Sequence, residues 1–282
     1  MSHADVLVIT ANKETEPSMN NDPCTDAQQI IDVMLQMRDE EQSRILSRFF
    51  KTGKGQYGEG DRFLGIKVPQ TRMVVKLVQL PVALNEIDKL LDSEWHEVRL
   101  CGLLLLVRMM QQAVPQKSDA SILMLQKKAL RRQELVQYYI RRAERANNWD
   151  LVDLSAPYIL GAWMLYPGED GQPVGRDVLM QLASDSCLWK QRIAIVSVLM
   201  LIRHHQFDET LQLARRLLHH PHDLIQKAVG WMLREMGKRD ITLLRDFLQE
   251  HSTSMPRTSL RYAIEKMDPG ERRYWMKRRE KR

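Results

Sequence analysis

The chain has 282 residues, of which 44% are hydrophobic and 28% charged, so it can bury a large core without disulfides or metals. Its formal net charge is +6 with a sequence pI near 9.2, and residues 271–282 alone carry seven Lys or Arg against two Glu. This excess of positive charge favours a polyanionic partner, although many basic proteins use such charge only to repel one another in solution.

The three cysteines, Cys24, Cys101 and Cys187, lie far apart and belong to no CxxC motif or Cys/His cluster. The sequence therefore predicts neither a disulfide framework nor a metal site. No basic segment precedes the short apolar run near the N-terminus, and no run of 18 apolar residues occurs, so we expect neither a signal peptide nor a membrane span. A reducing, cytoplasmic compartment fits this pattern.

Residues 1–25 are polar and rich in Asn, Pro and Thr, which predicts a disordered N-terminal tail. Beyond them, apolar residues recur at helical spacing, as Ile45, Leu46, Phe49 and Phe50 do in SRILSRFF. Short breakers separate these segments at Pro81, Pro115, Gly168, Gly171, Pro173, Pro221 and Pro256. Convincing period-two alternation is absent, so we expect an all-α protein.

The helical segments show weak internal similarity. DSEWHEVR at residues 92–99, DSCLWKQR at 185–192 and HPHDLIQK at 220–227 have the same length, end in a cation and open an apolar helix. Helix pairs repeated at roughly 35 to 47 residues are typical of a HEAT-like solenoid, an α-α superhelix in which neighbouring repeats share one core. Equivalent positions of successive repeats would then line its concave face in a row.

Four residues are candidates for one such row. Trp149 precedes Asp153 by one helical turn, and Asp153, Arg192 and Trp231 follow one another at intervals of 39 residues. Indole faces and a carboxylate attract a cation, and a guanidinium can bind a phosphate through two hydrogen bonds. Taken singly, each residue is better explained structurally, as a core indole, a helix-flanking arginine or a carboxylate in a first helical turn. Their common spacing is what favours a shared function.

Other candidates are weaker. His96 beside Glu97 lacks metal-ligand spacing, and a solvated or helix-end histidine is the better interpretation. The segment YGEGDRFLGIKVPQTR at residues 57–72 has the wrong glycine spacing for a nucleotide-binding loop, and no strand precedes it. It predicts a loop that enters a helix, with Lys67 and Arg72 available to a backbone phosphate.

Four segments in this order resemble the AlkD-type DNA alkylation repair glycosylases: YGEGDRFLGIKVPQTR, NNWDLVDLSAP, LWKQRIAIVS and LIQKAVGWMLRE. The resemblance runs from about Asp26 to about Met267. It implies a HEAT-like superhelix with a basic concave face for duplex DNA. The Trp, Asp, Arg and second Trp of the family's cleft correspond here to Trp149, Asp153, Arg192 and Trp231. An aromatic residue near DNA corresponds to Tyr57, and we add Lys227 as a DNA-binding candidate.

The resemblance implies excision of 3-methyladenine and 7-methylguanine from duplex DNA by a monofunctional glycosylase that does not flip the base into a pocket. Alkylation at N3 or N7 makes the purine a cation and weakens its glycosidic bond. Asp153 would stabilise the oxocarbenium-like sugar and Arg192 would hold the adjacent phosphate. This chemistry requires no metal and no organic cofactor.

The expected organisation is a repeat domain over residues 26–267 and a basic C-terminal tail over 268–282, in a monomer associated with the nucleoid through DNA. In the tail, ERRYWMKRREKR is either a nucleic-acid contact or a solvated helix end. Two other functions remain open. A non-catalytic HEAT-like protein could bind DNA shape or damage without Asp153, and a protein-binding solenoid would make the basic charge incidental.

Overall fold

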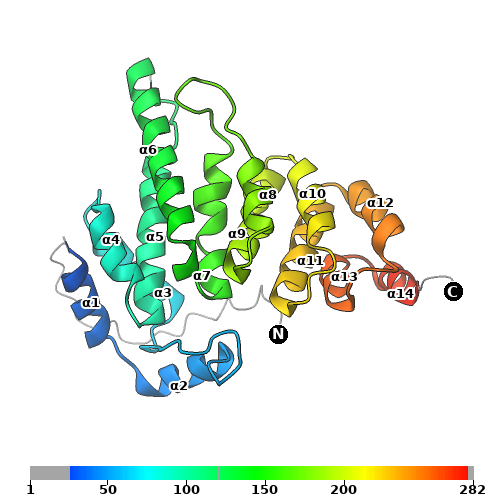
Figure 1. Cartoon of the computed structure of the whole chain (residues 1–282), viewed down its shortest axis with the longest axis horizontal. Helices are drawn as coiled ribbons and strands as arrows, with labels where there is room; N and C mark the ends of the chain where they lie inside the picture. The colour runs from blue at the N-terminus through cyan, green and yellow to red at the C-terminus, as the bar shows by residue number, and fades with distance from the viewer. Residues whose placement is uncertain (1–25, 120, 279–282) are drawn as a thin grey trace.

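The structure, a computed structural model, describes residues 26–119 and 121–278. Within these ranges it confirms the all-α class, with fourteen α-helices and no strand (Figure 1). The helices are α1 (Ala27–Gln36), α2 (Glu40–Phe49), α3 (Val68–Leu77), α4 (Leu84–Leu91), α5 (His96–Ala113), α6 (Ile122–Arg141), α7 (Trp149–Asp153), α8 (Asp177–Ala183), α9 (Leu188–Arg203), α10 (Asp208–Arg216), α11 (Asp223–Gly237), α12 (Ile241–His251), α13 (Arg257–Ala263) and α14 (Pro269–Lys277). The tail predicted for residues 1–25 lies outside the described residues.

From α5 onward the helices follow one another in chain order along the long axis of the molecule (Figure 1). One row contains α5, the α7 segment with the π-helical turn Pro157–Gly161, then α9, α11 and α13, each in contact with the next. The helices α4, α6, α8, α10 and α12 cover this row from one side, each packed on a neighbour within it. The predicted helical-repeat solenoid is therefore confirmed. No described helix is both long and apolar enough to cross a membrane.

Two helices of the row, α5 and α9, are buried on nearly every side. Fifteen of the 18 residues of α5 are buried, and so are all residues of α9 from Arg192 to Leu199. A helix that is buried all round requires neighbours on all its faces. For α5 these are α3, α4, α6, α7 and the π-helical turn, and for α9 they are α7, α8, α10, α11 and the same turn. Because α5 is buried from its first residue and α9 is buried from Arg192 onward, His96 and Arg192 carry polar groups into the interior.

The segment between α2 and α3 is irregular, and one carboxylate binds three of its backbone N–H groups. Glu97 accepts hydrogen bonds from the backbone N–H groups of Leu64, Gly65 and Ile66 at 2.9, 2.9 and 3.1 Å. Gly65 has a φ of 90°, and a Cβ there would lie 2.1 Å from the carbonyl oxygen of Asp39. The glycine of FLGI is therefore required where the backbone passes close to Asp39, the residue that precedes α2.

The C-terminal boundary differs from the predicted one. In place of a basic tail from residue 268, the chain forms α14, whose first turn is capped by the side chain of Asp268. Trp275 is 5% exposed and belongs to the main core, and Arg245 pairs with Glu271 at 2.8 Å. Residues 268–278 therefore complete the solenoid. Trp275 is neither a solvated helix-end residue nor free to contact DNA.

Candidate active site

A short helix places two of the predicted residues. The helix α7 has five residues, from Trp149 to Asp153, so these two side chains stand one turn apart on one face. Asn148 precedes it in an extended conformation, and its side-chain oxygen accepts a hydrogen bond from the Trp149 N–H at 2.9 Å. The Asn148 amide is itself buried and donates to Asp61 at 3.0 Å. The second residue of the NNWD motif, Asn148, thus fixes the helix to the 50–67 segment.

Asp153 and Arg192 meet directly. Arg192, in the first turns of α9, donates through Nε and Nη2 to the two carboxylate oxygens of Asp153 at 3.0 and 2.8 Å. Its Nη1 donates to the carbonyl oxygen of Leu224 on α11 at 2.5 Å. This two-bond geometry is the strong form of an arginine–carboxylate pair. One side chain therefore connects α7, α9 and α11.

The burial of Arg192 corrects one predicted role. Its side chain is 0% exposed, whereas that of Asp153 is 11% exposed. A guanidinium that is buried and bonded in this way cannot also bind a DNA phosphate, so in this conformation Arg192 holds Asp153 instead. Burial raises the pKa of the Asp153 carboxyl, and the charge and hydrogen bonds of Arg192 oppose that rise.

Trp149 lies in an aromatic cluster with Phe50, Phe63 and Leu224. Phe50 stacks between Trp149 and Phe63, with ring centroids 5.3 and 5.1 Å away. Only 6% of Trp149 is exposed, and the exposed ring of Phe49 meets it edge-on at 5.9 Å. The protein therefore covers nearly all of the indole, which leaves little of it for contact with a ligand.

Tyr57 and Lys227 approach the same group from two other segments. Tyr57 is half-buried and packs on the aromatic cluster. Burial raises the pKa of the Tyr57 hydroxyl, while a side-chain hydrogen bond with Trp149 and the charges of Lys227 and Arg192 lower it. The Lys227 side chain is 26% exposed and pairs with Asp223 at 2.6 Å. A partly exposed cation and a phenol therefore border the Trp149–Asp153 helix.

Two predicted residues lie elsewhere, whereas Trp231 follows Lys227 by one turn on α11 and is half-buried against the main core. Lys67 and Arg72 are exposed at the beginning of α3, which packs on α1 and α5 and not in the row of α7, α9 and α11. The predicted residues that the structure brings together are Tyr57, Trp149, Asp153, Arg192 and Lys227.

A buried histidine, which the sequence analysis interpreted as a solvated or helix-end residue, lies next to this group. His96 begins α5, as expected for a helix-end residue, but it is 2% exposed and not solvated. Its Nδ1 lies 3.2 Å from Asp61 and its Nε2 lies 2.9 Å from Asp150. Burial lowers its pKa, but the two carboxylates prevail and raise the pKa of His96 to about 9. Arg99 also donates to Asp61, at 2.5 Å.

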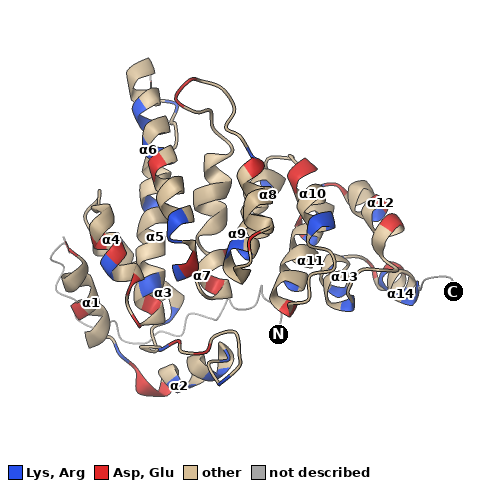
Figure 2. Cartoon of the chain, in the orientation of Figure 1, with Lys and Arg blue, Asp and Glu red and all other residues tan. Residues whose placement is uncertain are grey.

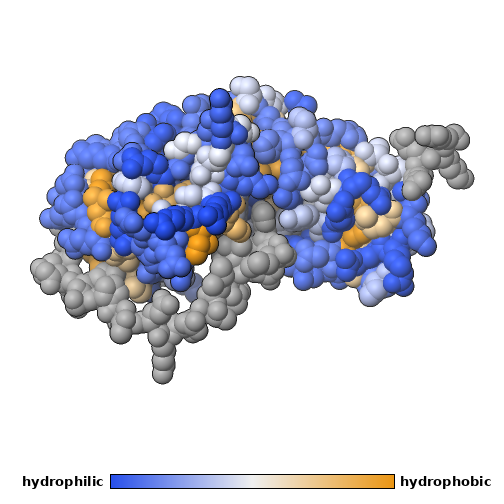
Figure 3. All heavy atoms as spheres, turned by 90° about the horizontal axis from the view of Figure 1, so that it is seen from below, coloured by the Kyte–Doolittle hydropathy of each residue, from blue (hydrophilic) through white to orange (hydrophobic). Residues whose placement is uncertain are grey.

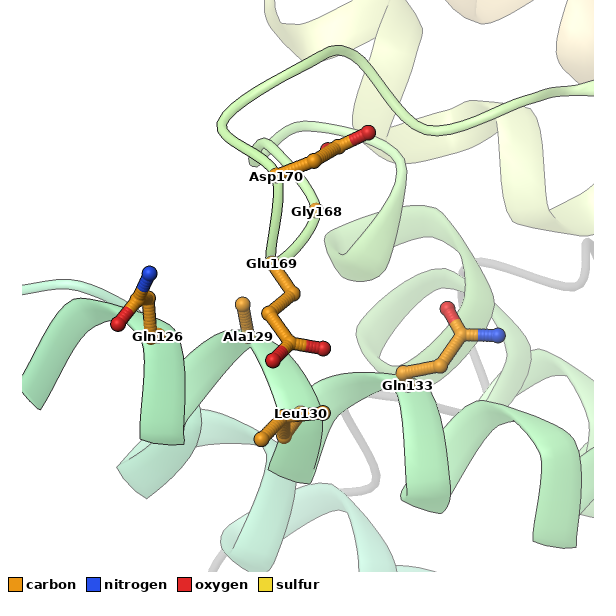
Figure 4. A pocket seen from close by; sticks show the side chains of 7 residues that line it. All are labelled: Gln126, Ala129, Leu130, Gln133, Gly168, Glu169 and Asp170. Atoms are coloured by element: carbon orange, nitrogen blue, oxygen red, sulfur yellow. The ribbon is translucent and has the colours of Figure 1, made fainter. Parts of the chain in front are cut away.

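Opposite charges lie close together around the lower ends of α5, α7 and α9 (Figure 2), in agreement with the ion pairs described above. Seen from that side, the described surface is largely hydrophilic with separate hydrophobic spots (Figure 3). A hollow of about 560 Å³ lies between α6 and residues 168–170 (Figure 4). Glu169 points into it toward Leu130, and none of the predicted residues lines it. The candidate site is therefore the Asp153 surface and not this hollow.

Comparison with known proteins identifies the family. The sequence model of a family described as "DNA alkylation repair enzyme" matches residues 30–267. A solved structure, "Predicted DNA alkylation repair enzyme from Enterococcus faecalis", superposes with a TM-score of 0.58 at 18% identity, covering 82% of this chain and 97% of that one. No curated protein matches. At that identity the structural likeness shows the fold alone, but the family match covers most of the sequence. The chain therefore belongs to the family of DNA alkylation repair enzymes.

Proposed function

We propose that this protein is a monofunctional DNA glycosylase, acting as a monomer, that excises N3- and N7-alkylated purines from duplex DNA. The observation that carries the proposal is the Asp153 carboxylate, held by two hydrogen bonds from a buried arginine beside Trp149 and still 11% exposed. Membership of an alkylation repair family makes damaged DNA the expected substrate. The basic net charge is consistent with a polyanionic partner.

The chemistry requires little more than a fixed negative charge. An alkylated purine already carries a positive charge, so its glycosidic bond breaks with both electrons going to the base nitrogen. The sugar becomes an oxocarbenium-like cation, which a carboxylate near C1′ stabilises. Water then adds to C1′ and releases a proton, and the product is an abasic site. Asp153 can supply that carboxylate because Arg192 donates a hydrogen bond to each of its two oxygens, which favours the charged form.

The proposed reaction ends without a strand cut. Cleavage by a bifunctional glycosylase requires a neutral amine that attacks C1′ and forms a Schiff base. Lys227, which borders this site, is ion-paired with Asp223 at 2.6 Å, and Lys51 lies over the ring of Tyr57 at 5.9 Å, so both ammonium groups already have partners. We therefore propose hydrolysis by water.

The same geometry supports a second candidate. Both oxygens of Asp153 are bonded to Arg192, and Trp149 is 6% exposed, as expected if the two residues are mainly structural. The protein would then recognise damaged DNA without excising a base. The two candidates differ in whether Asp153 takes part in breaking a bond.

One assay separates them. Free 7-methylguanine and 3-methyladenine released from methylated duplex DNA are measured for the wild type, Asp153→Asn and the control Asp223→Asn, whose side chain is 55% exposed in the wild type. We expect release by the wild type and the control and loss of most release in Asp153→Asn. Thermal unfolding and DNA affinity are measured alongside, to show that Asp153→Asn folds and binds. Binding without release by the wild type would overturn the glycosylase and leave the damage-binding protein.

A further inference from the structure

We propose that His96 is a positioning residue of this site, a buried imidazolium that fixes α7 against the 50–67 segment and neutralises Asp150 next to Asp153. This inference rests on the proposed glycosylase function. His96 touches neither the substrate nor the reacting atoms in this scheme. It acts through the residues that do.

The geometry itself requires the charged ring. Each ring nitrogen of His96 lies within hydrogen-bond distance of a carboxylate oxygen, at 3.2 Å from Asp61 and 2.9 Å from Asp150. A neutral imidazole has one N–H, so its other nitrogen would turn a lone pair toward a carboxylate, whereas the imidazolium donates to both. The three side chains are at most 9% exposed, so water cannot replace a missing donor. The charged form is the one that satisfies both carboxylates.

Asp150 depends on His96 more than Asp61 does. Asp61 also accepts hydrogen bonds from Arg99 and from the Asn148 amide. Of the Asp150 oxygens, Oδ2 lies against His96, and the buried Oδ1 has no hydrogen-bond partner within the described chain. Removing the His96 charge would therefore leave a buried carboxylate in α7 uncompensated.

His96 is also packed into the surroundings of Trp149. Its ring stacks on Phe63 at 4.5 Å and lies 5.0 Å from Phe50, which in turn stacks on Trp149. The hydrogen bonds to Asp61 and Asp150 connect the beginning of α5 to the 50–67 segment and to α7. One residue thus ties together the elements that carry Tyr57, Trp149 and Asp153.

The link from His96 to Asp153 is electrostatic. Asp150 precedes Asp153 by three residues in α7, and its negative charge is one of the groups that raise the pKa of Asp153. In this part of the structure three carboxylates, on Asp61, Asp150 and Asp153, lie against three cations, on His96, Arg99 and Arg192. Loss of the His96 proton would leave the negative charge of Asp150 without its cation. Asp150 lies one turn before Asp153, the carboxylate that the proposed reaction uses.

The test is a double-mutant cycle of His96→Gln and Asp150→Asn, with His204→Gln as the control, because His204 is exposed at the end of α9. The assay measures the single-turnover excision rate on methylated duplex DNA and the affinity for the same duplex without methylation. We expect His96→Gln to lower the rate by about tenfold or more while the DNA Kd changes by less than about threefold. Adding Asp150→Asn should restore much of the rate, because a Gln–Asn hydrogen bond needs no charge.

A second readout needs no mutation. The charged groups that face His96 among the described residues are Asp61, Asp150 and, from its own helix, Arg99. The excision rate of the wild type, corrected for enzyme-free release, should fall above about pH 9 as His96 loses its proton. The double variant lacks this charge and should keep its rate over the same pH range.

The outcomes are distinct. If the wild type excises no alkylated base, the proposed function fails and this inference fails with it. If the wild type is active and His96→Gln is equally active, only the positioning role is refuted. Additive losses in the double variant, with no rescue, would show that the network serves folding alone. Thermal unfolding of each variant identifies any that does not fold, and the wild-type pH profile then decides.

Discussion

Replacing Arg192 by Met should strongly destabilise the protein even without DNA. Methionine keeps much of the apolar stem but removes the guanidinium, which is 0% exposed and donates to Asp153 and to the Leu224 carbonyl. The change leaves a largely buried carboxylate without its cation. Breaking a buried pair from one side costs about 3–5 kcal/mol in the free energy of unfolding, because the remaining charge is uncompensated.

Thermal and urea unfolding at pH 7 measure this cost. For a protein of this size each kcal/mol corresponds to a few degrees, so Tm should fall by roughly 6 to 20 °C. Adding Asp153→Asn to Arg192→Met should recover part of the loss, because a neutral amide is easier to bury than an unpaired carboxylate. The recovery, expressed as a coupling energy between the two positions, isolates the ion pair from the lost packing.

The matched control is Lys227→Met, which breaks the partly exposed pair with Asp223 and should cost less than about 1 kcal/mol. If Arg192→Met costs no more than this control, the guanidinium is not a buried partner of Asp153. The reasoning would then be refuted, and the phosphate-binding role predicted from the sequence would stand again.

Three further predictions follow from individual residues. Because the pKa of His96 in the fold, about 9, lies above its ordinary value, its stabilisation of about 3 kcal/mol should be complete below about pH 6.5 and lost as pH rises through 9. Equal denaturant midpoints at pH 6.5 and 9.5 would contradict this. Gly65→Ala should cost about 2 kcal/mol or more, since φ is 90° and the new Cβ would meet Asp39, and an unchanged urea midpoint would exclude this close approach to Asp39. Trp275→Ala should lower the free energy of unfolding by about 3–5 kcal/mol, and an unaffected Tm would show that residues 268–278 are a tail that does not pack on the core.

Much of the fold could be predicted from sequence because its signals are local. Apolar periodicity defines a helix within one segment, and breakers such as Pro115 and Pro221 fall between helices as expected. The C-terminal boundary was missed because the last segment is dominated by charge. Its contribution to the core is essentially one side chain, Trp275, and a single buried residue on a short basic helix leaves no periodic pattern.

The site was only partly predictable, because spacing indicates which face of a helix a residue occupies but not how deeply its side chain is buried. The 39-residue interval correctly placed Asp153 and Arg192 on adjacent members of one row, where they form an ion pair. It could not show that Arg192 is fully buried. The burial of His96 was missed for a related reason: its partners Asp61 and Asp150 are 35 and 54 positions away, and nothing near His96 in the sequence indicates them.

The ion pair with Arg192 does not use every hydrogen-bonding direction of the Asp153 carboxylate. Two carboxylate oxygens offer about four lone-pair directions, and a bidentate arginine uses one on each oxygen. The 11% of the side chain that remains exposed is the part not covered by protein, and the buried guanidinium fixes its orientation before any substrate arrives. A charge held in place in this way needs no reorganisation when a positive sugar forms beside it, which is the condition for electrostatic catalysis. A structural ion pair and a catalytic carboxylate are therefore compatible in one residue, provided that its cation lies behind it and the substrate approaches from the exposed edge.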